Sequence, residues 1–146
     1  MEIEGTSEVD YNYSNAKRYS ILILDDEPDV TAVLKKGLEA RAPFDVHAYN
    51  DPEEALKSIS TTHYDVMIID IRLPKMNGFE FYQKAQQLKD TRVLFITASD
   101  SYHEEYKSKY PKWNGNCFIL KPISITMLAK FLISEIGTRA EKEPYN

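Results

Sequence analysis

Short apolar runs alternate with segments of helical periodicity along most of the chain. Five such runs predict β-strands, at residues 19–24, 44–49, 65–70, 92–96 and 117–120. Apolar side chains that recur three and four residues apart predict helices between and after them. The first helix begins near Pro28, the second begins at Asp51-Pro52, and two more cover residues 78–88 and 124–136.

Each predicted helix is expected to bury one face. The expected apolar positions are Val30, Val33, Leu34 and Leu38 in the first helix, Phe79, Phe81, Tyr82, Ala85 and Leu88 in the third, and Met127, Leu128, Phe131, Leu132 and Ile136 in the last. Strands that alternate with helices predict an α/β fold with a mostly parallel sheet. Because the strands are almost continuously apolar, helices should cover both faces of that sheet.

This pattern occupies the middle of the chain and predicts one domain over residues 19–137. Residues 1–18 are acidic and polar and are expected to form a flexible tail, and residues 138–146 a polar C-terminal tail. Residues 99–116 fit the alternation least well, because they are charged and aromatic with little aliphatic content. A polar helix over 101–110, ended by Pro111, is the best interpretation of this segment.

Composition and charge exclude several classes of function. The chain has 146 residues, which suits one domain, and a net charge of −5 without a cluster of basic residues, which argues against direct nucleic-acid binding. The single cysteine, Cys117, allows no intramolecular disulfide and is expected in the core. No apolar run approaches the roughly 20 residues that cross a bilayer, and the acidic N-terminus is unlike a secretory leader. We therefore expect a cytoplasmic protein that does not bind membranes.

Polar residues with complementary chemistry follow four of the five predicted strands. They are Asp25-Asp26-Glu27 after the first strand, Asp70 at the end of the third, Thr97-Ala98-Ser99 after the fourth and Lys121-Pro122 after the fifth. Ligands of open parallel sheets bind outside the carboxyl ends of the strands, where these residues should converge. Each alone is an ordinary cap or loop residue, and it is the combination that indicates a functional site.

The charges suggest which chemistry this site performs. Closely packed carboxylates repel one another unless a cation or a proton intervenes, and Mg²⁺ suits a site with a few carboxylates and several waters. A lysine and a hydroxyl would bind the remaining oxygens of a phosphoryl group, whose transfer depends mainly on positioning and electrostatic stabilisation. An aspartate such as Asp70 can itself accept the group as an acyl phosphate.

At residues 19–136 the sequence resembles the receiver domain of two-component response regulators. The resemblance rests on the acid pair Asp25-Asp26, on Asp70 within the stretch 68–78 with its Pro74 and Gly78, on Thr97-Ala98, and on 118–122 with an aromatic residue three positions before Lys121. It implies a flavodoxin-like, five-stranded sheet of order 2-1-3-4-5. It also implies phosphorylation of Asp70 by a sensor histidine kinase or a phosphotransfer protein.

The resemblance also implies roles for the other site residues. Asp26 and Asp70 would coordinate Mg²⁺ directly, Asp25 through water and Arg72 through its backbone carbonyl; Lys121 would pair with the phosphoryl group, Thr97 would move to hydrogen-bond it, and Phe118 would swing inward behind Thr97. A charge that biases such a two-state element is a recognised form of switching. Arg72 and Ser99, each two residues beyond a site residue, would flank an attacking water, so we hypothesise that they tune the lifetime of the acyl phosphate.

Two features depart from the family. Residues 99–116 are rich in Tyr, Lys and Glu where the family usually carries small residues shortly before the last strand. This part of the usual partner or dimer surface is therefore either a solvated charged segment or a specialised docking surface. Only about ten residues, most of them polar, follow Ile136, which predicts a stand-alone receiver that signals by docking to a downstream protein target. It would be a monomer or a weak phosphorylation-dependent dimer, and no enzyme beyond its own phosphorylation and autodephosphorylation.

Three other functions are weighed against this one. A haloacid-dehalogenase-type phosphatase shares the residue types, but it needs a second aspartate two residues after the first, where this chain has Arg72. A degenerate receiver that serves only as an interaction module would be favoured by loss of the acid pair, Asp70 or Lys121, all of which are present. A nucleotide-binding domain is disfavoured because no glycine-rich loop follows a strand.

Overall fold

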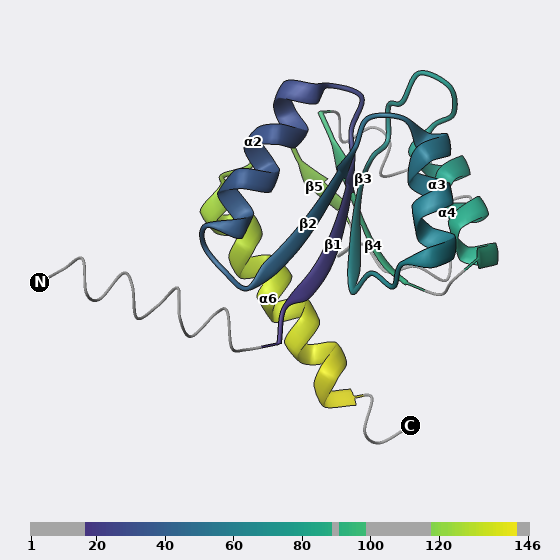
Figure 1. Ribbon diagram of the computed structural model, residues 1–146. Helices are drawn as coiled ribbons and strands as arrows, with labels where there is room; N and C mark the ends of the chain where they lie inside the picture. Colours follow the sequence, from purple (N-terminus) through teal and green to yellow (C-terminus); the bar gives the residue numbers. More distant parts are fainter. Residues whose placement is uncertain (1–16, 89–90, 99–117, 143–146) are drawn as a thin grey trace, which may run out of the picture.

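The computed structural model describes residues 17–88, 91–98 and 118–142, with residues 138–142 described by their backbone alone. Five strands form one parallel sheet in the order β2-β1-β3-β4-β5 (Figure 1). Their bounds are Tyr19–Leu24 for β1, Phe44–Tyr49 for β2, Val66–Asp70 for β3, Arg92–Thr97 for β4 and Phe118–Leu120 for β5. This confirms the predicted fold class and strand order.

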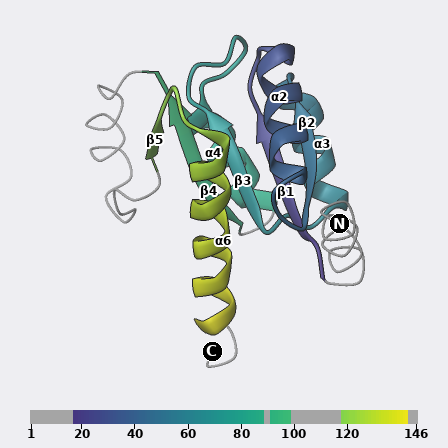
Figure 2. The ribbon, with the colours of Figure 1, turned by 90° about the vertical axis from the view of Figure 1, so that its left-hand side faces the viewer.

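Four helices of the described residues cover the sheet. They are α2 (Pro28–Glu39), α3 (Pro52–Thr61), α4 (Gly78–Leu88) and α6 (Ile125–Lys142). Helices α2 and α6 lie on one face of the sheet, and α3 and α4 lie on the other (Figures 1 and 2). The central strands β1, β3 and β4 therefore have their apolar side chains covered on both faces, which explains why they are almost continuously apolar. The edge strand β5 is less covered, and its Leu120 is 50% exposed.

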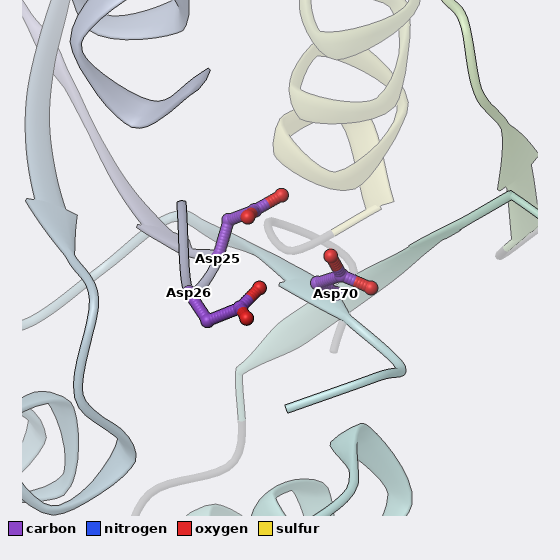
Figure 3. Close-up of side chains that lie close together, drawn as sticks. All are labelled: Asp25, Asp26 and Asp70. Atoms are coloured by element: carbon purple, nitrogen blue, oxygen red, sulfur yellow. The ribbon is translucent and has the colours of Figure 1, made fainter. Parts of the chain in front are cut away.

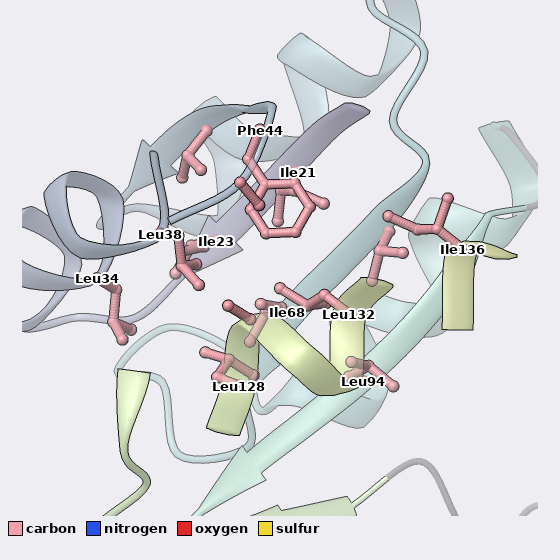
Figure 4. Packing of buried hydrophobic residues seen from close by; sticks show 14 of the residues in the cluster. Ile21, Ile23, Leu34, Leu38, Phe44, Ile68, Leu94, Leu128, Leu132 and Ile136 are labelled. Atoms are coloured by element: carbon pink, nitrogen blue, oxygen red, sulfur yellow. The ribbon is translucent and has the colours of Figure 1, made fainter. Parts of the chain in front are cut away.

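Two hydrophobic clusters fill the spaces between the sheet and the helices. The cluster under α2 and α6 joins strand residues such as Ile21, Phe44 and Ile68 to Leu38 and Leu132 (Figure 4). The cluster under α3 and α4 includes Leu22, Tyr64, Met67, Phe79, Phe81 and Phe95. Neighbouring residues of one strand thus pack into different clusters, as the alternation of side chains along a strand requires.

The strand register brings the carboxyl ends of four strands to one level. Leu24 at the end of β1 pairs with Ile69 of β3, Asp70 pairs with Ile96 of β4, and Thr97 pairs with Leu120 of β5. The residues that follow these positions must therefore emerge close together at one edge of the sheet.

Local sequence explains where helices begin. The Asp51 carboxylate accepts a hydrogen bond from the backbone N–H of Glu54 at 3.3 Å, and Pro52 occupies the first helical position of α3. Pro28 has the same place in α2. Both starts were predicted from the sequence.

Some predicted core positions are wrong. Val33 of α2, Met127 of α6 and Leu88 of α4 have exposed fractions of 60%, 59% and 47%. In α2 the buried stripe consists of Thr31, Leu34 and Leu38, and Val33 lies off it. Thr31 is polar but lies on the helix face that packs against the sheet, so it is buried. Val33 is apolar but lies on another face, so it is exposed.

Some predicted boundaries also differ. Helix α6 runs to Lys142, so it includes residues 138–142, which the sequence assigned to a polar tail. Polar composition alone does not end a helix, since a solvated helix end tolerates polar residues well. Strand β4 includes Thr97, and β3 begins at Val66.

The helix predicted over 101–110 and the core position predicted for Cys117 lie outside the described residues. In the described part of the chain, no helix combines the length and apolarity that a bilayer span needs.

Candidate functional site

Three carboxylates gather at the carboxyl edge of the sheet (Figure 3). Asp25 and Asp26 directly follow β1, and Asp70 is the last residue of β3. One carboxylate oxygen from each lies within 4.8 Å of the others. Asp25 and Asp70 are buried, with exposed fractions of 3% and 7%, whereas Asp26 is exposed. The cluster is therefore open to solvent on the side of Asp26.

Lys121 joins the two buried carboxylates. Its ammonium group donates hydrogen bonds to Oδ2 of Asp25 and Oδ2 of Asp70, both at 2.9 Å. The lysine follows β5, and its backbone N–H donates to the carbonyl of Thr97 at 2.8 Å, which continues the pairing with β4. The site thus holds one ammonium and three carboxylates, and this imbalance leaves it with negative charge that a further cation would neutralise.

Backbone donors hold the other oxygens of the two buried carboxylates. Oδ1 of Asp25 accepts from the N–H of Glu27 at 2.9 Å, and Oδ1 of Asp70 accepts from the N–H of Arg72 at 3.0 Å. Each carboxylate is therefore fixed between one backbone donor and Lys121. Such fixed geometry is what a group needs if it is to bind a metal or receive a phosphoryl group.

Burial affects the acid and the base of this site differently. Removal of the Asp70 carboxyl group from water raises its pKa above the usual value, although the hydrogen bonds from Lys121 and Arg72 oppose the rise. For Lys121, burial lowers the pKa, but the hydrogen bonds to Asp25 and Asp70 outweigh it and raise the pKa. The lysine therefore stays charged at neutral pH, and Asp70 is the carboxylate whose ionised form is poorly stabilised by the fold alone.

Thr97 lies on β4, the strand beside Asp70, and Phe118 lies on β5, the strand beyond β4. Thr97 is the last residue of β4 and is buried, with an exposed fraction of 1%. The ring of Phe118 in β5 is half-buried and contacts Phe95 and Phe79, with centroid distances of 5.4 Å and 6.3 Å. Thr97 thus ends the strand next to β3, and Phe118 begins the edge strand β5.

The loop after Asp70 returns tightly onto the strand. The N–H of Gly78 donates to the carbonyl of Ile71 at 2.7 Å, and a Cβ atom at Gly78 would lie 2.7 Å from the carbonyl oxygen of Asp70. Asn77 and Glu80 then form a reciprocal pair: each side chain accepts a hydrogen bond from the other residue's backbone N–H at 2.9 Å. The first turn of α4 is therefore fixed directly against the backbone of Asp70.

The structure brings most of the predicted site residues together. Asp25, Asp70 and Lys121 are in direct contact, Asp26 completes the acid cluster, and Thr97 ends the neighbouring strand. Arg72 contributes its backbone N–H, and its side chain is exposed. Ser99 lies outside the described residues.

One contact at the site was missed by sequence reasoning. Asn50, which directly follows β2, donates its side-chain amide to the backbone carbonyl of Asp25 at 2.9 Å and to the hydroxyl of Thr31 at 3.0 Å. The available signal was its position, because a residue after the second strand lies at the same edge of the sheet as residues after the other strands.

Comparison with known proteins identifies the family. The family model for the response regulator receiver domain matches residues 21–133. The chain therefore belongs to the receiver domains of two-component response regulators. This assignment also decides against the haloacid-dehalogenase-type phosphatase and the nucleotide-binding domain.

Individual relatives agree with this assignment. The chain is 31% identical over 117 residues to the sensor protein EvgS of Escherichia coli K12, covering 80% of this chain and 10% of that protein. It is 31% identical over 124 residues to the response regulator ArlR of Staphylococcus aureus, covering 84% and 55%. The chain thus spans between a tenth and about half of the length of these relatives, so their activities as whole proteins do not transfer to it.

Solved structures show the same fold. A CheY-like receiver domain protein from Methanospirillum hungatei superposes with a TM-score of 0.76 at 23% identity, over 86% of this chain and 99% of that one. The receiver domain of the hybrid histidine kinase CckA superposes with a TM-score of 0.65 at 28% identity, over 80% and 98%.

Proposed function

We propose that Asp70 accepts a phosphoryl group and that the domain signals in its phosphorylated form. The observation that carries this proposal is the position of Asp70, a buried carboxylate at the end of β3 that shares one ammonium with Asp25. An oxygen of Asp70 would attack phosphorus, and the bond from phosphorus to the imidazole nitrogen of a donor phosphohistidine would break. The donor keeps that electron pair and takes up a proton, while Asp70 becomes an acyl phosphate.

The acid cluster fits a Mg²⁺ ion. Three carboxylates within 4.8 Å, one of them exposed, match the oxygen ligands and the partial hydration that this ion prefers. Asp26 and Asp70 would hold it directly, Asp25 through water and Arg72 through its carbonyl. The ion would supply positive charge to the phosphoryl oxygens.

The remaining site residues would bind the phosphoryl group and change position in response to it. Lys121 would pair with a phosphoryl oxygen, and Thr97, at the end of the next strand, would move to hydrogen-bond another. Phe118, half-buried against Phe79 and Phe95, would then turn inward behind Thr97.

Arg72 and Ser99 would affect the rate at which the acyl phosphate is hydrolysed. Substitution of both residues tests this, and an unchanged dephosphorylation rate would contradict it.

The partners follow from this chemistry. A sensor histidine kinase or a phosphotransfer protein would supply the phosphoryl group, and a downstream protein would bind the switched surface. We propose that the domain acts in the cytoplasm as a monomer or weak phosphorylation-dependent dimer, without nucleic-acid contact and without catalysis on external substrates. The stand-alone arrangement stays a prediction, and the mass of the native protein in a cell extract tests it.

Phosphorylation by a small donor tests the main proposal. After incubation with Mg²⁺ and acetyl phosphate, intact mass should rise by one phosphoryl group in the native protein and not in Asp70→Asn. Omission of Mg²⁺ should also abolish the gain, because the acid cluster then lacks the charge that neutralises the phosphoryl oxygens. No gain in the native protein with Mg²⁺ would favour an interaction module that works without phosphorylation.

A further inference from the structure

The turn between β2 and α3 contacts the loops that follow β1 and β3, the two strands whose carboxyl ends carry the acid cluster. Asn50 and Asp51 are adjacent in this turn, and their side chains reach in different directions. Asn50 contacts the loop after β1, which carries Asp25 and Asp26. Asp51 contacts Lys75 in the loop after β3, five residues beyond Asp70. Neither residue belongs to the acid cluster itself.

The contacts of Asn50 fix the loop after β1. Its amide donates to the carbonyl of Asp25 at 2.9 Å and to Oγ1 of Thr31 at 3.0 Å, and the Thr31 hydroxyl donates to the carbonyl of Pro28 at 3.1 Å. The backbone N–H of Asp25 donates to the carbonyl of Tyr49 at 3.1 Å. The backbone of Asp25 is thus held on both its N–H and its carbonyl by residues 49 and 50.

The contacts of Asp51 fix the loop after β3. Oδ1 of Asp51 lies 3.0 Å from Nζ of Lys75, while Oδ2 accepts from the N–H of Glu54 at the start of α3. This pair lowers the pKa of Asp51 and raises the pKa of Lys75, chiefly through their hydrogen bond. The Lys75 side chain is 60% exposed, so the pair is expected to be individually weak.

We propose that Asn50 and Asp51 form a brace that sets the spacing between Asp25-Asp26 and Asp70, and so the affinity of the site for Mg²⁺. The two residues are positioning residues, since neither touches the acid side chains. The inference rests on the proposed Mg²⁺ site. Groups that orient metal ligands without touching the metal contribute substantially to metal affinity. If the brace acts as one unit, loss of the contact at either end already lets the distance between the acids vary. Loss of both contacts should then weaken Mg²⁺ binding little further.

Direct calorimetric titration with Mg²⁺ tests the brace. Asn50→Ala removes the contact with the first loop and should weaken Mg²⁺ binding about tenfold. The charge-neutral pair Asp51→Asn with Lys75→Met removes the contact with the second loop. Because asparagine caps helices as well as aspartate, this pair keeps the start of α3. It should weaken binding about twofold to fivefold.

Combining all three substitutions distinguishes one brace from two separate supports. A single brace predicts that the triple variant binds Mg²⁺ with the same affinity as Asn50→Ala, because coupled contacts are not additive. The product of the two separate losses would overturn the brace, as would Asn50→Ala with the affinity of the native protein. If Asn50→Ala does not fold, Asn50→Leu replaces it, since it has a similar size but no N–H donor and no added charge, and it should also bind more weakly.

A matched control separates positioning from general loss of stability. Gln86 also donates a side-chain amide to a backbone carbonyl, that of Thr91, at 3.1 Å, but at the opposite end of the sheet. Gln86→Ala should leave Mg²⁺ affinity unchanged at a similar cost in stability. If the native protein itself bound no Mg²⁺, the proposed function would fail. If it bound Mg²⁺ and the Asn50 variants bound equally well, the brace alone would fail.

Discussion

At the scale of single residues, the fold disfavours the ionised form of the Asp70 carboxyl group. Its carboxylate is buried beside Asp25 and shares the one ammonium of Lys121 with it. Burial is the main reason that its pKa is raised above the reference value of 3.8. The folded state therefore binds the Asp70 proton more tightly than the unfolded state does. The free energy of unfolding should fall as pH rises from the unfolded pKa through the raised folded pKa.

This sign predicts that Asp70→Asn stabilises the protein at neutral pH without Mg²⁺. The amide carries no charge to desolvate, so the free energy of unfolding should rise by about 0.5–2 kcal/mol, as is typical when a functional site loses its strain. The gain should shrink as pH falls through the raised pKa of Asp70 in the folded protein, where the native carboxylate becomes protonated. Urea unfolding in the presence of a chelator measures this. A less stable variant at neutral pH would mean that the contact with Lys121 outweighs burial.

The residues that the sequence predicted are those whose chemistry is unusual for their position. Asp25, Asp26, Asp70 and Lys121 are charged residues that end or follow apolar strands, and such a pattern is visible without coordinates. Asn50 was not predicted, because an asparagine in a turn has an ordinary local explanation. Its role depends on a hydrogen bond to the backbone of Asp25, and backbone acceptors leave no trace in the sequence.

At the scale of secondary-structure elements, the sequence predicted which segments are helices better than which side chains they bury. Helix α2 begins at Pro28 as expected, yet it buries Thr31 and exposes Val33. Apolar residues on a helix indicate a face only as an average. The actual stripe depends on the rotation of the helix against its neighbours, which is a property of the packed molecule. Thr31 can be buried because its hydroxyl is hydrogen-bonded to Asn50 and Pro28.

Helix α4 is packed directly against the backbone of the site, which makes Gly78 sensitive to substitution. A Cβ atom there would lie 2.7 Å from the Asp70 carbonyl oxygen and 2.9 Å from Cα of Ile71. Both are backbone atoms, so the helix or the strand end has to move. Gly78→Ala should lower the free energy of unfolding by about 1–3 kcal/mol, as overpacking does. It should also slow phosphorylation of Asp70 by acetyl phosphate.

Gly137→Ala provides the control for this substitution. Gly137 lies in α6, and a Cβ atom there has no neighbour within 4 Å. Alanine is favoured over glycine in helices, so this variant should be more stable by about 0.4–1 kcal/mol. Its phosphorylation rate should match that of the native protein. Equal stability losses in both variants would show that close approach at Gly78 is not the cause.

At the scale of the whole molecule, the buried carboxylates of the described residues lie at one edge of the sheet, whereas the core is apolar. The two apolar clusters stabilise the domain, whereas the carboxyl edge brings three carboxylates within 4.8 Å. That arrangement costs stability unless a cation neutralises it. A ligand that binds only the folded state raises the free energy of unfolding, by about 2.7 kcal/mol at 100 times its dissociation constant.

Saturating Mg²⁺ should therefore reverse the order of stability between the native protein and Asp70→Asn. Without Mg²⁺ the variant is expected to be more stable, because it lacks a buried charge. With Mg²⁺ the native protein should gain about 2.7 kcal/mol, more than the advantage of the variant, which has lost one of its carboxylates and binds the ion weakly. Thermal unfolding of both, with NaCl of equal ionic strength as the reference, measures the reversal. Asp26→Asn keeps the buried Asp70–Lys121 contact but loses an exposed ligand, so it should also gain little. Equal gains in all three proteins would mean that Mg²⁺ acts elsewhere, and the cluster of Asp25, Asp26 and Asp70 would not be its site.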